Sequence, residues 1–422
     1  MDKLVVEGGK KLSGEIKISG AKNSALPIMA ATLLTDEVCT LRNVPRLRDT
    51  LTMIKLLRTL GKIVETDKDK VIISAVLKGE PKYIAEYKLV STMRGSFCVL
   101  GPLLTKLGKA KVSLPGGCVI GVRPVDLHLK GLKALKAKFT FENGYIIATA
   151  KRLKGNHMYL GGAFGSSVLA TANVMMAATL ADGETVIEAA ACEPEVEDLA
   201  DFLVCMGAKI KGQGSPRITI NGVKKLHGVD FRVIPDRIEA GTFMIMAAAT
   251  KSNLVLKDVR IEHLSALVDK LSEAGVRIKQ EGSNVRVLPA KKINPSSVTT
   301  YPYPGFPTDL QAQFMAFMAL SSGVSVISDK VYPDRFIHIA ELNRMGANIK
   351  REGINAIVQG VKALYGAPVM ASDLRASAAL LIAGLAAKGK TEIQRIYHLE
   401  RGYEAIEEKL TKIGATVYRE KE

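Results

Sequence analysis

The chain has 422 residues, of which 47% are hydrophobic and 24% charged, a balance typical of a globular protein. Lys and Arg number 59 against 42 Asp and Glu, which gives a formal net charge of +17. This excess fits nucleic acid, a membrane surface or a small anionic substrate, and composition alone does not choose among them.

Several classes of protein are disfavoured. The first ten residues lack the apolar segment of a secretory signal, and the longest apolar run, Ala376 to Ala387, is too short to cross a bilayer. The cysteines form no CxxC pair and the six histidines form no HExxH pattern, so neither a disulfide framework nor a metal site is indicated. We expect a cytoplasmic protein that uses no metal and no cofactor.

A short pattern recurs along the chain about every 70 residues, longer than common solenoid periods. It is a helix-like stretch that ends in Gly and is followed by a β-pattern; the second copy has Lys136 in place of Gly. The copies are LLRTLGKIV from Leu56, GLKALKAKF from Gly131, FLVCMGAKI from Phe202, KLSEAGVRI from Lys270, ELNRMGANI from Glu341 and KLTKIGATV from Lys409.

The local pattern of each copy predicts an amphipathic helix and a hairpin. Apolar residues recur at helical spacing, as at Leu264, Leu267, Val268 and Leu271. The terminal Gly accepts a positive φ and closes the helix. Strand-like alternation follows on both sides of a turn, and in the second copy that turn is Asn143-Gly144, a strong type I′ signal.

A different helix precedes each amphipathic one. These segments are apolar nearly all round, so they predict helices buried on every side. They begin near Ser24, Ser96, Ser167, Gly241, Asp309 and Ser377.

The economical interpretation is six repeated units, three before about Val233 and three after, forming two similar α/β domains with central helices and outward-facing sheets. The alternative is coincidental patterning of an ordinary α/β chain.

Three segments depart from the repeat and are candidates for chemistry, because the chain has no P-loop and no GxGxxG after a strand. In the first, SGAKNSALP from Ser19, Lys22 and Asn23 precede a buried helix, whose N-terminal field suits an anion. A solvated lysine is the alternative.

The second segment is the Gly-rich loop LPGGCVIGVRPVDL from Leu114. Cys118 lies at its centre with Arg123 nearby, a setting that lowers a thiol pKa. The alternative is a small buried residue. Cys98 and Cys205 fall in helix patterns, where we expect core residues.

The third segment is the Pro-rich YPYPGFPTDLQAQ from Tyr301, which places Asp309 before a buried helix. Asp309 is either functional or a helix N-cap worth about 1 kcal/mol. Arginines near helix starts in both halves would suit phosphate and carboxylate, which Arg binds in bidentate geometry. They are Arg94, Arg335, Arg375 and Arg401.

Together these motifs resemble the UDP-N-acetylglucosamine enolpyruvyl transferases, the UDP-N-acetylglucosamine 1-carboxyvinyltransferases of the EPSP synthase superfamily. The resemblance spans essentially the full length, and the PGGC loop and PGFPTDLQ are its most specific parts. The motifs are SGAKNSALPIMAATLL, LPGGCVIGVRPVDLH, PDRIEAGTF, YPGFPTDLQAQ, RFIHIAELNRMGA, DLRASAALLIAGLAA and LERGYE.

The resemblance implies a two-domain inside-out α/β barrel of six βαβαββ-type units, three per domain. One domain would contain residues 22–233 and the Cys118 loop. The other would combine residues 1–21 with 234–422, and the active site would lie in the cleft between them.

The resemblance also implies transfer of enolpyruvate from phosphoenolpyruvate to the 3′-hydroxyl of UDP-N-acetylglucosamine, with release of phosphate. Cys118 would be the general acid and Asp309 the base, while Lys22, Arg123 and Arg401 would hold phosphate and carboxylate. The implied sugar-nucleotide contacts are Asn23, Arg94, Arg123, Pro124, Val125, Asp126, Leu127, Asp309 and Val331, with Arg335, Asp373 and Arg375 as further site residues.

One segment departs from the family pattern. Where the family usually has Ser-Val-Gly-Ala-Thr, this chain has Ser167-Val168-Leu169-Ala170-Thr171, and Gly165 stands where Lys is usual. The departure affects the expected nucleotide contacts and leaves the catalytic set intact.

Two other functions are alternatives to this reaction. Enolpyruvyl transfer to shikimate 3-phosphate would not depend on Cys118. Nucleic-acid binding is motivated only by the charge, and it is disfavoured because the charge is scattered, Trp is absent and aromatic residues make up 5%. We expect a monomer with small-molecule substrates and no nucleic-acid or membrane partner.

Overall fold

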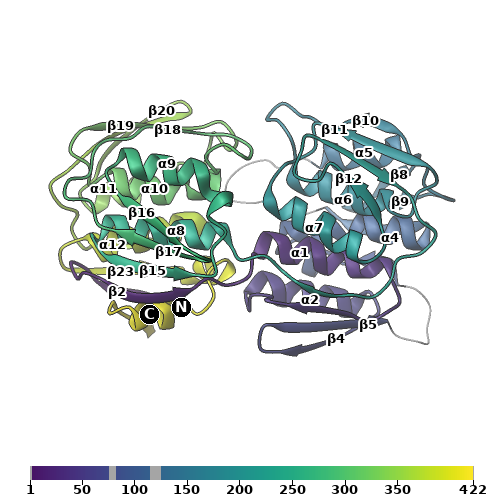
Figure 1. The fold of residues 1–422 in the computed structure, drawn as a ribbon, viewed down its shortest axis with the longest axis horizontal. Helices are drawn as coiled ribbons and strands as arrows, with labels where there is room; N and C mark the ends of the chain where they lie inside the picture. The colour runs from purple at the N-terminus through teal and green to yellow at the C-terminus, as the bar shows by residue number, and fades with distance from the viewer. Residues whose placement is uncertain (1, 76–81, 115–124, 422) are drawn as a thin grey trace. The chain divides into compact units, whose positions relative to one another are not determined.

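The computed structural model describes residues 2–75, 82–114 and 125–421, which divide into two compact units (Figure 1). Unit 1 contains the described residues up to Ser19 and from Pro235 onward. Unit 2 contains the described residues between Gly20 and Ile234. The family resemblance predicts domain boundaries at residues 21/22 and 233/234.

Unit 2 contains three βαβαββ repeats. The leading strand of the first repeat, β14, comes from the C-terminal end of the residues that form unit 2. The first comprises β14 (Asp230–Arg232), α1 (Lys22–Ala31), η1 (Thr32–Leu34), β3 (Cys39–Arg42), α2 (Arg48–Thr59), β4 (Lys62–Asp67) and β5 (Lys70–Ala75). The second comprises β6 (Ile84–Ala85), α3 (Tyr87–Val90), η2 (Arg94–Val99), α4 (Leu100–Leu107), β7 (Lys109–Ser113), α5 (Asp126–Ala134), β8 (Lys138–Glu142) and β9 (Tyr145–Thr149). The third comprises β10 (His157–Tyr159), α6 (Val168–Ala178), β11 (Glu184–Glu188), α7 (Pro194–Cys205), β12 (Lys209–Lys211) and β13 (Arg217–Asn221).

Unit 1 is also built from three βαβαββ repeats, and two of its strands, β1 and β2, come from the N-terminal part of the chain. One repeat comprises β2 (Ser13–Lys17), α8 (Arg237–Ala249), β15 (Asn253–Lys257), η3 (Ile261–Leu264), α9 (Ser265–Glu273), β16 (Arg277–Glu281) and β17 (Asn284–Leu288). The next comprises β18 (Val298–Thr300), η4 (Thr308–Leu310), α10 (Gln311–Met318), β19 (Val324–Asp329), α11 (His338–Arg344), β20 (Asn348–Glu352) and β21 (Asn355–Gln359). The last comprises β22 (Pro368–Met370), α12 (Leu374–Ala386), β23 (Lys390–Gln394), η5 (Ile396–Arg401), α13 (Ile406–Lys412), β24 (Thr416–Lys421) and β1 (Asp2–Glu7).

The strands form six four-stranded sheets, one for each repeat. In each sheet the leading strand runs parallel to its neighbour and the other pairings are antiparallel, as in the order β10-β11-β13-β12. In the last sheet β1 takes an inner position, antiparallel to both β23 and β24. The predicted six βαβαββ units are therefore confirmed.

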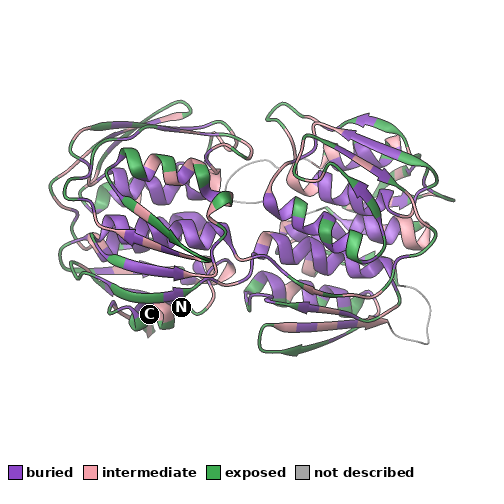
Figure 2. Ribbon diagram, viewed as in Figure 1, coloured by how far each residue is buried: buried purple, intermediate pink, exposed green. Residues whose placement is uncertain are grey.

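The helices predicted to be apolar all round lie in the core of each unit (Figure 2). All thirteen residues of α8 are buried, and α12 packs against both α8 and α10. The amphipathic helices bury one face, as Leu267 and Leu271 do in α9. Cys98 is buried as expected, but the expectation for Cys205 is wrong, because this last residue of α7 is exposed.

The recurring Gly is explained by the backbone conformation at the end of each amphipathic helix, where the residue adopts a left-handed, positive φ. Five copies end in a Gly with φ between 89° and 101°, and in the second copy Lys136 adopts φ 71° at the same place. Asn143 and Gly144 have φ 49° and 78°, as the predicted type I′ turn requires. The backbone of the repeat therefore persists where its Gly is missing.

The shared backbone conformation of Gly61 and Lys136 predicts how substitution at each position changes stability. Gly61 has φ 89° and open space on the side where a Cβ would project, so Gly61→Ala should lower the free energy of unfolding by about 1 kcal/mol through backbone strain alone. Lys136→Gly is the matched control and should stay within about 0.5 kcal/mol of the parent, because relief of strain offsets the added chain entropy. Urea unfolding of both variants measures this, and equal destabilisation would contradict it.

Candidate active site

Asp309 lies in the 3₁₀ turn η4, directly before the buried helix α10. The capping alternative for this residue is wrong, since neither η4 nor α10 has a side-chain cap. The main-chain oxygen of Asp309 instead accepts a hydrogen bond from Gln313 Nε2 at 2.8 Å. The Pro-rich segment and Gln313 thus fix the backbone and leave the carboxylate free for other partners.

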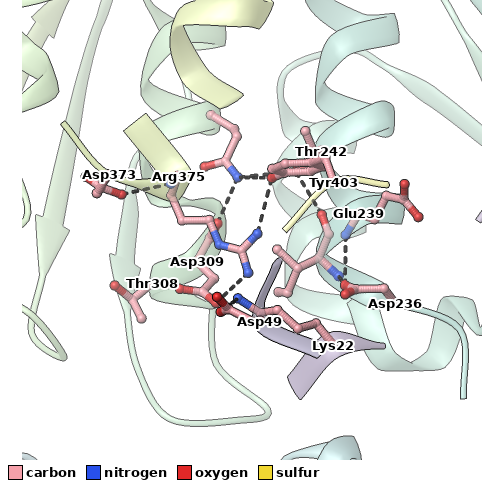
Figure 3. Close-up of polar contacts among 12 residues, drawn as sticks. Lys22, Asp49, Asp236, Glu239, Thr242, Thr308, Asp309, Asp373, Arg375 and Tyr403 are labelled. Carbon is pink, nitrogen blue, oxygen red and sulfur yellow. Dashed lines mark hydrogen bonds and ion pairs between the residues drawn. The ribbon is translucent and has the colours of Figure 1, made fainter. Parts of the chain in front are cut away.

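Two buried arginines hold the Asp309 carboxylate in unit 1. Arg335 Nη1 donates to Oδ1 at 2.8 Å. Arg375 Nη2 donates to Oδ2 at 2.9 Å (Figure 3). The arginine side chains are 5% and 4% exposed, whereas that of Asp309 is 27% exposed. Burial opposes ionisation, but the charges of Arg375 and Arg335 outweigh it and hold the pKa of Asp309 well below its usual value. Asp309 is therefore an anion that solvent or a substrate can reach.

Arg375 is oriented by its surroundings on α12. Its Nη1 donates to the Tyr403 hydroxyl at 3.3 Å, and Tyr403 also lies 2.9 Å from the Thr242 hydroxyl. The predicted pairing of Asp373 with Arg375 takes a specific form: Asp373 caps α12 and accepts from the Arg375 backbone N–H at 2.8 Å. Cap and phenol together aim the guanidinium at Asp309 (Figure 3).

Lys22 forms a separate cluster in unit 2. It is the first residue of α1, it is buried, and its Nζ lies 3.4 Å from Asp49 Oδ2 on α2. This contradicts the solvated-lysine alternative. Ser24, two residues on, donates to Asp198 of α7, which also accepts from the Ile234 backbone N–H. Asn23 is half-buried between Lys22 and Ser24 on the first turn of α1.

In unit 2, the charge of Arg94 acts close to the stretch from Val125 to Leu127. Arg94 begins η2, and its charge acts on His128, the residue that follows Leu127. Burial, and then Arg94, lower the pKa of His128 to about 3, so the imidazole is neutral and accepts from Asn173 Nδ2 at 3.0 Å. The neutral ring therefore adds no second positive charge near Arg94.

The altered family segment adjoins the same stretch. Gly162 packs against the Leu127 side chain, and Gly162 and Gly165 pair through two backbone hydrogen bonds of 2.9 and 3.1 Å. Ser167 then caps α6. The structure therefore brings the departure from the family pattern next to an expected substrate contact.

The remaining predicted residues are placed as follows. Arg401 ends η5, and Gly402 after it packs against Leu374 at the start of α12. Val331 donates its backbone N–H to Asp329 at 3.0 Å. Asp126 and Val125 stand at the start of α5. Cys118, Arg123 and Pro124 lie outside the described residues.

Sequence reasoning missed four partners. Asp49 is an ordinary member of a helix pattern, and only packing brings it to Lys22. Gln313 and Tyr403 lie in the motifs that carry the family resemblance, but nothing in the sequence indicated that they contact the Asp309 main chain and Arg375. Thr308 was adjacent to Asp309 in the quoted motif, and its hydroxyl accepts from Arg335 Nη1 at 3.2 Å. The signals available were a hydroxyl beside a candidate carboxylate and, for Gln313, a position four residues after Asp309 in a predicted helix.

Neither a metal cluster nor a membrane-spanning helix occurs within residues 2–75, 82–114 and 125–421. These ranges hold no group of three or more His, Cys, Asp or Glu arranged to bind a metal ion. Their helices are too short or too polar to span a bilayer.

Known proteins match the chain over its whole length. The model of the EPSP synthase (3-phosphoshikimate 1-carboxyvinyltransferase) family matches residues 6–410. UDP-N-acetylglucosamine 1-carboxyvinyltransferases of Lawsonia intracellularis and Geotalea daltonii are 51% and 53% identical over 422 residues, covering all of both chains. The chain belongs to the UDP-N-acetylglucosamine 1-carboxyvinyltransferase family.

Solved structures agree with this membership at the level of the fold. The enolpyruvyl transferase NikO from Streptomyces tendae matches with TM-score 0.90 and 25% identity, covering 99% of this chain and 98% of its own. EPSP synthase from Acinetobacter baumannii matches with TM-score 0.77 and 19% identity over the full length of both chains. The predicted enolpyruvyl transferase fold, a two-domain inside-out α/β barrel, is thereby confirmed.

The Asp309 cluster predicts a specific pH dependence of stability. Because the folded pKa lies below the unfolded one, the contribution of Asp309 is present above its ordinary pKa near 3.8 and is lost as the pH falls toward the folded value. Asp309→Asn should therefore cost about 2–3 kcal/mol at neutral pH, and the difference from the parent should shrink below pH 4. Urea unfolding of both proteins across this pH range measures it.

Asp334→Asn is the matched control, because Asp334 is exposed and pairs with Arg351 at 3.1 Å on the surface. It should cost no more than about 0.5 kcal/mol. A difference between Asp309→Asn and the parent that stays constant with pH would contradict the assignment.

Proposed function

We propose that the chain transfers the enolpyruvyl group of phosphoenolpyruvate to the 3′-hydroxyl of UDP-N-acetylglucosamine and releases phosphate. This is the first committed step of peptidoglycan precursor synthesis. The observation that carries the proposal is the match, at about half identity and over the full chain, to proteins named for this reaction.

The reaction proceeds by addition and elimination. The sugar hydroxyl oxygen bonds to C2 of phosphoenolpyruvate and loses its proton, while C3 gains a proton, which gives a tetrahedral intermediate. Loss of phosphate from C2 and of a proton from C3 then gives the enolpyruvyl ether. The enzyme has to supply an acid, a base and cations for the phosphate and carboxylate.

Asp309 fits the role of base in a restricted way. Two guanidinium partners keep it anionic at neutral pH, so it accepts a hydrogen bond from a hydroxyl but is a weak base toward an unreacted one. Proton transfer to it becomes favourable as the bond to C2 forms and the hydroxyl becomes acidic. This confines deprotonation to the transition state, where it accelerates the reaction.

The other roles are assigned by family resemblance. Cys118 donates the proton to C3, and Lys22, Arg123 and Arg401 bind phosphate and carboxylate. The burial of Lys22 at the start of α1 supports its role, since the ammonium and the helix N-terminus present positive potential together. Arg335, Asp373 and Arg375 support Asp309.

We propose nine residues as contacts of UDP-N-acetylglucosamine, by family resemblance. They are Asn23, Arg94, Arg123, Pro124, Val125, Asp126, Leu127, Asp309 and Val331. We propose that the chain acts in the cytoplasm as a monomer, without a cofactor and without a nucleic-acid or membrane partner.

The acceptor decides between this function and transfer to shikimate 3-phosphate. Phosphate release from phosphoenolpyruvate should require UDP-N-acetylglucosamine and should not occur with shikimate 3-phosphate. A coupled phosphate assay measures both reactions, with Asp309→Asn as the inactive control. Turnover with shikimate 3-phosphate, or no turnover with either acceptor, would overturn the proposal.

A phosphonate epoxide of the fosfomycin type tests the role of Cys118. It should alkylate Cys118, and Cys118→Asp should escape alkylation while keeping activity, because a carboxylic acid can also donate the proton. Intact-mass and peptide analysis locates the adduct. Cys205→Ser is the matched control, because Cys205 is exposed and lies outside the proposed site, and it should still be modified at Cys118. An adduct elsewhere, or an inactive Cys118→Asp variant, would weaken the assignment.

A further inference from the structure

Asp329 is a fully buried carboxylate at the end of β19 that the proposed chemistry does not use. Its Oδ1 accepts from the Thr300 hydroxyl at 2.7 Å and from the backbone N–H groups of Val331 and Tyr332 at 3.0 and 2.7 Å. Its Oδ2 accepts from the Thr308 hydroxyl at 2.7 Å. Four hydrogen bonds to one buried side chain are more than a strand end requires.

The bond to Thr308 sets the polarity of the next contact. A hydroxyl carries one hydrogen, so a Thr308 that donates to Asp329 offers only lone pairs elsewhere. Those lone pairs accept from Arg335 Nη1 at 3.2 Å, and the same nitrogen donates to Asp309 Oδ1 at 2.8 Å. The chain of bonds from Asp329 through Thr308 and Arg335 to Asp309 therefore has a defined donor and acceptor at every link.

Asp329 also fixes the segment that supplies Arg335. The backbone N–H groups of Val331 and Tyr332 donate to its Oδ1. The Tyr332 carbonyl in turn accepts from the Arg335 backbone N–H at 3.0 Å. The guanidinium carbon lies 5.9 Å from the centre of the Tyr332 ring. Both sides of the contact between Thr308 and Arg335 thus depend on one carboxylate.

Few other contacts hold the Arg335 guanidinium. Its Nε is buried and has no hydrogen-bond partner in the part of the chain that the structure describes. Its position is set by Thr308, Asp309 and the Tyr332 ring. A change in the polarity of Thr308 would therefore reach Asp309 through Arg335.

We propose that Asp329 is a positioning residue for enolpyruvyl transfer, which orients Thr308 so that Arg335 is held against Asp309. The proposal rests on the function proposed above. Asp329 touches no reacting atom, and it acts on Asp309 through Thr308 and Arg335.

Asp329→Asn tests the proposal with little change of shape. In the orientation that keeps three bonds, the amide oxygen still accepts from Thr300, Val331 and Tyr332, and the amide nitrogen faces Thr308 as a donor. The Thr308 oxygen then has to accept from both the new amide and Arg335, while its own hydrogen loses its acceptor, which turns the hydroxyl and weakens its bond to Arg335. We expect kcat to fall about tenfold while KM for phosphoenolpyruvate changes little and thermal unfolding stays cooperative.

A double-mutant cycle separates positioning from general destabilisation. Thr308→Val removes the hydroxyl, and in that background Asp329→Asn should change kcat by no more than about twofold. Thr308→Ser should retain activity. Thr300→Val is the matched control, because it removes another hydroxyl bond to Asp329 that does not reach Arg335, and it should retain kcat. Independent, multiplying effects of Asp329→Asn and Thr308→Val would overturn the proposal.

The titration of Asp309 gives a readout that does not need turnover. Loosening Arg335 should raise the pKa of Asp309, so the pH-dependent difference in urea stability between Asp329→Asn and its Asp309→Asn double variant should move to higher pH. Around Asp309, Arg375 is in direct contact, and the more distant titratable groups Asp236, Asp373, His338 and Tyr403 are the same in each pair of proteins. An unchanged transition would refute the proposal even if the parent turned over neither acceptor.

Discussion

The constraint on which the rest of the structure depends is that the central helices have no face that suits water. All thirteen residues of α8 are buried, as are eleven of the thirteen in α12. Such helices have to be enclosed on every side, whereas the sheets keep one polar face and go outside. An unpaired charge in this interior would cost several kcal/mol, and the charged side chains of the candidate site lie at the ends of these helices. Lys22 is the first residue of α1, Arg375 the second of α12, and Asp309 precedes α10.

The electrostatics of the Asp309 cluster follow from the same interior. Two guanidinium groups and one carboxylate carry a net charge of one positive unit in surroundings that exclude most water. Removing ions from water costs more than a single ion pair returns, so such a cluster is weak evidence for stability and is better explained by a ligand it serves. A cluster with an excess of positive charge suits the anionic substrates of the proposed reaction. Much of the remaining positive charge lies on exposed lysines of the described residues.

Sequence reasoning recovered the repeat because that information is local. Helix ends, the Asn143-Gly144 turn and the apolar helices are each specified within a few residues, and φ 71° at Lys136 shows that the register survives loss of a Gly. Some candidate site residues, such as Lys22, Asp309 and Arg375, were indicated by their neighbours in the chain, and their roles stay predictions. Their partners were not indicated, since Asp49 is 27 residues from Lys22 and Tyr403 is 28 from Arg375, and only tertiary packing joins them. The prediction that Cys205 is a core residue was wrong for a similar reason. The helix pattern predicts which face of α7 is buried, but it does not show that the last residue of the helix lies outside the core.

The inner position of β1 in the last sheet has a consequence for biosynthesis. β1 pairs with β23 and β24, which leave the ribosome long after it. The described part of unit 2 is synthesised once Ile234 has emerged, but β1 stays without its partners until β23 and β24 have followed. The edges of an unpaired strand invite wrong pairing, so the nascent chain carries an exposed strand through most of its synthesis. Lys3 lies in this strand and Lys10 and Lys11 follow it, and their positive charge disfavours wrong pairing while the strand is without its partners.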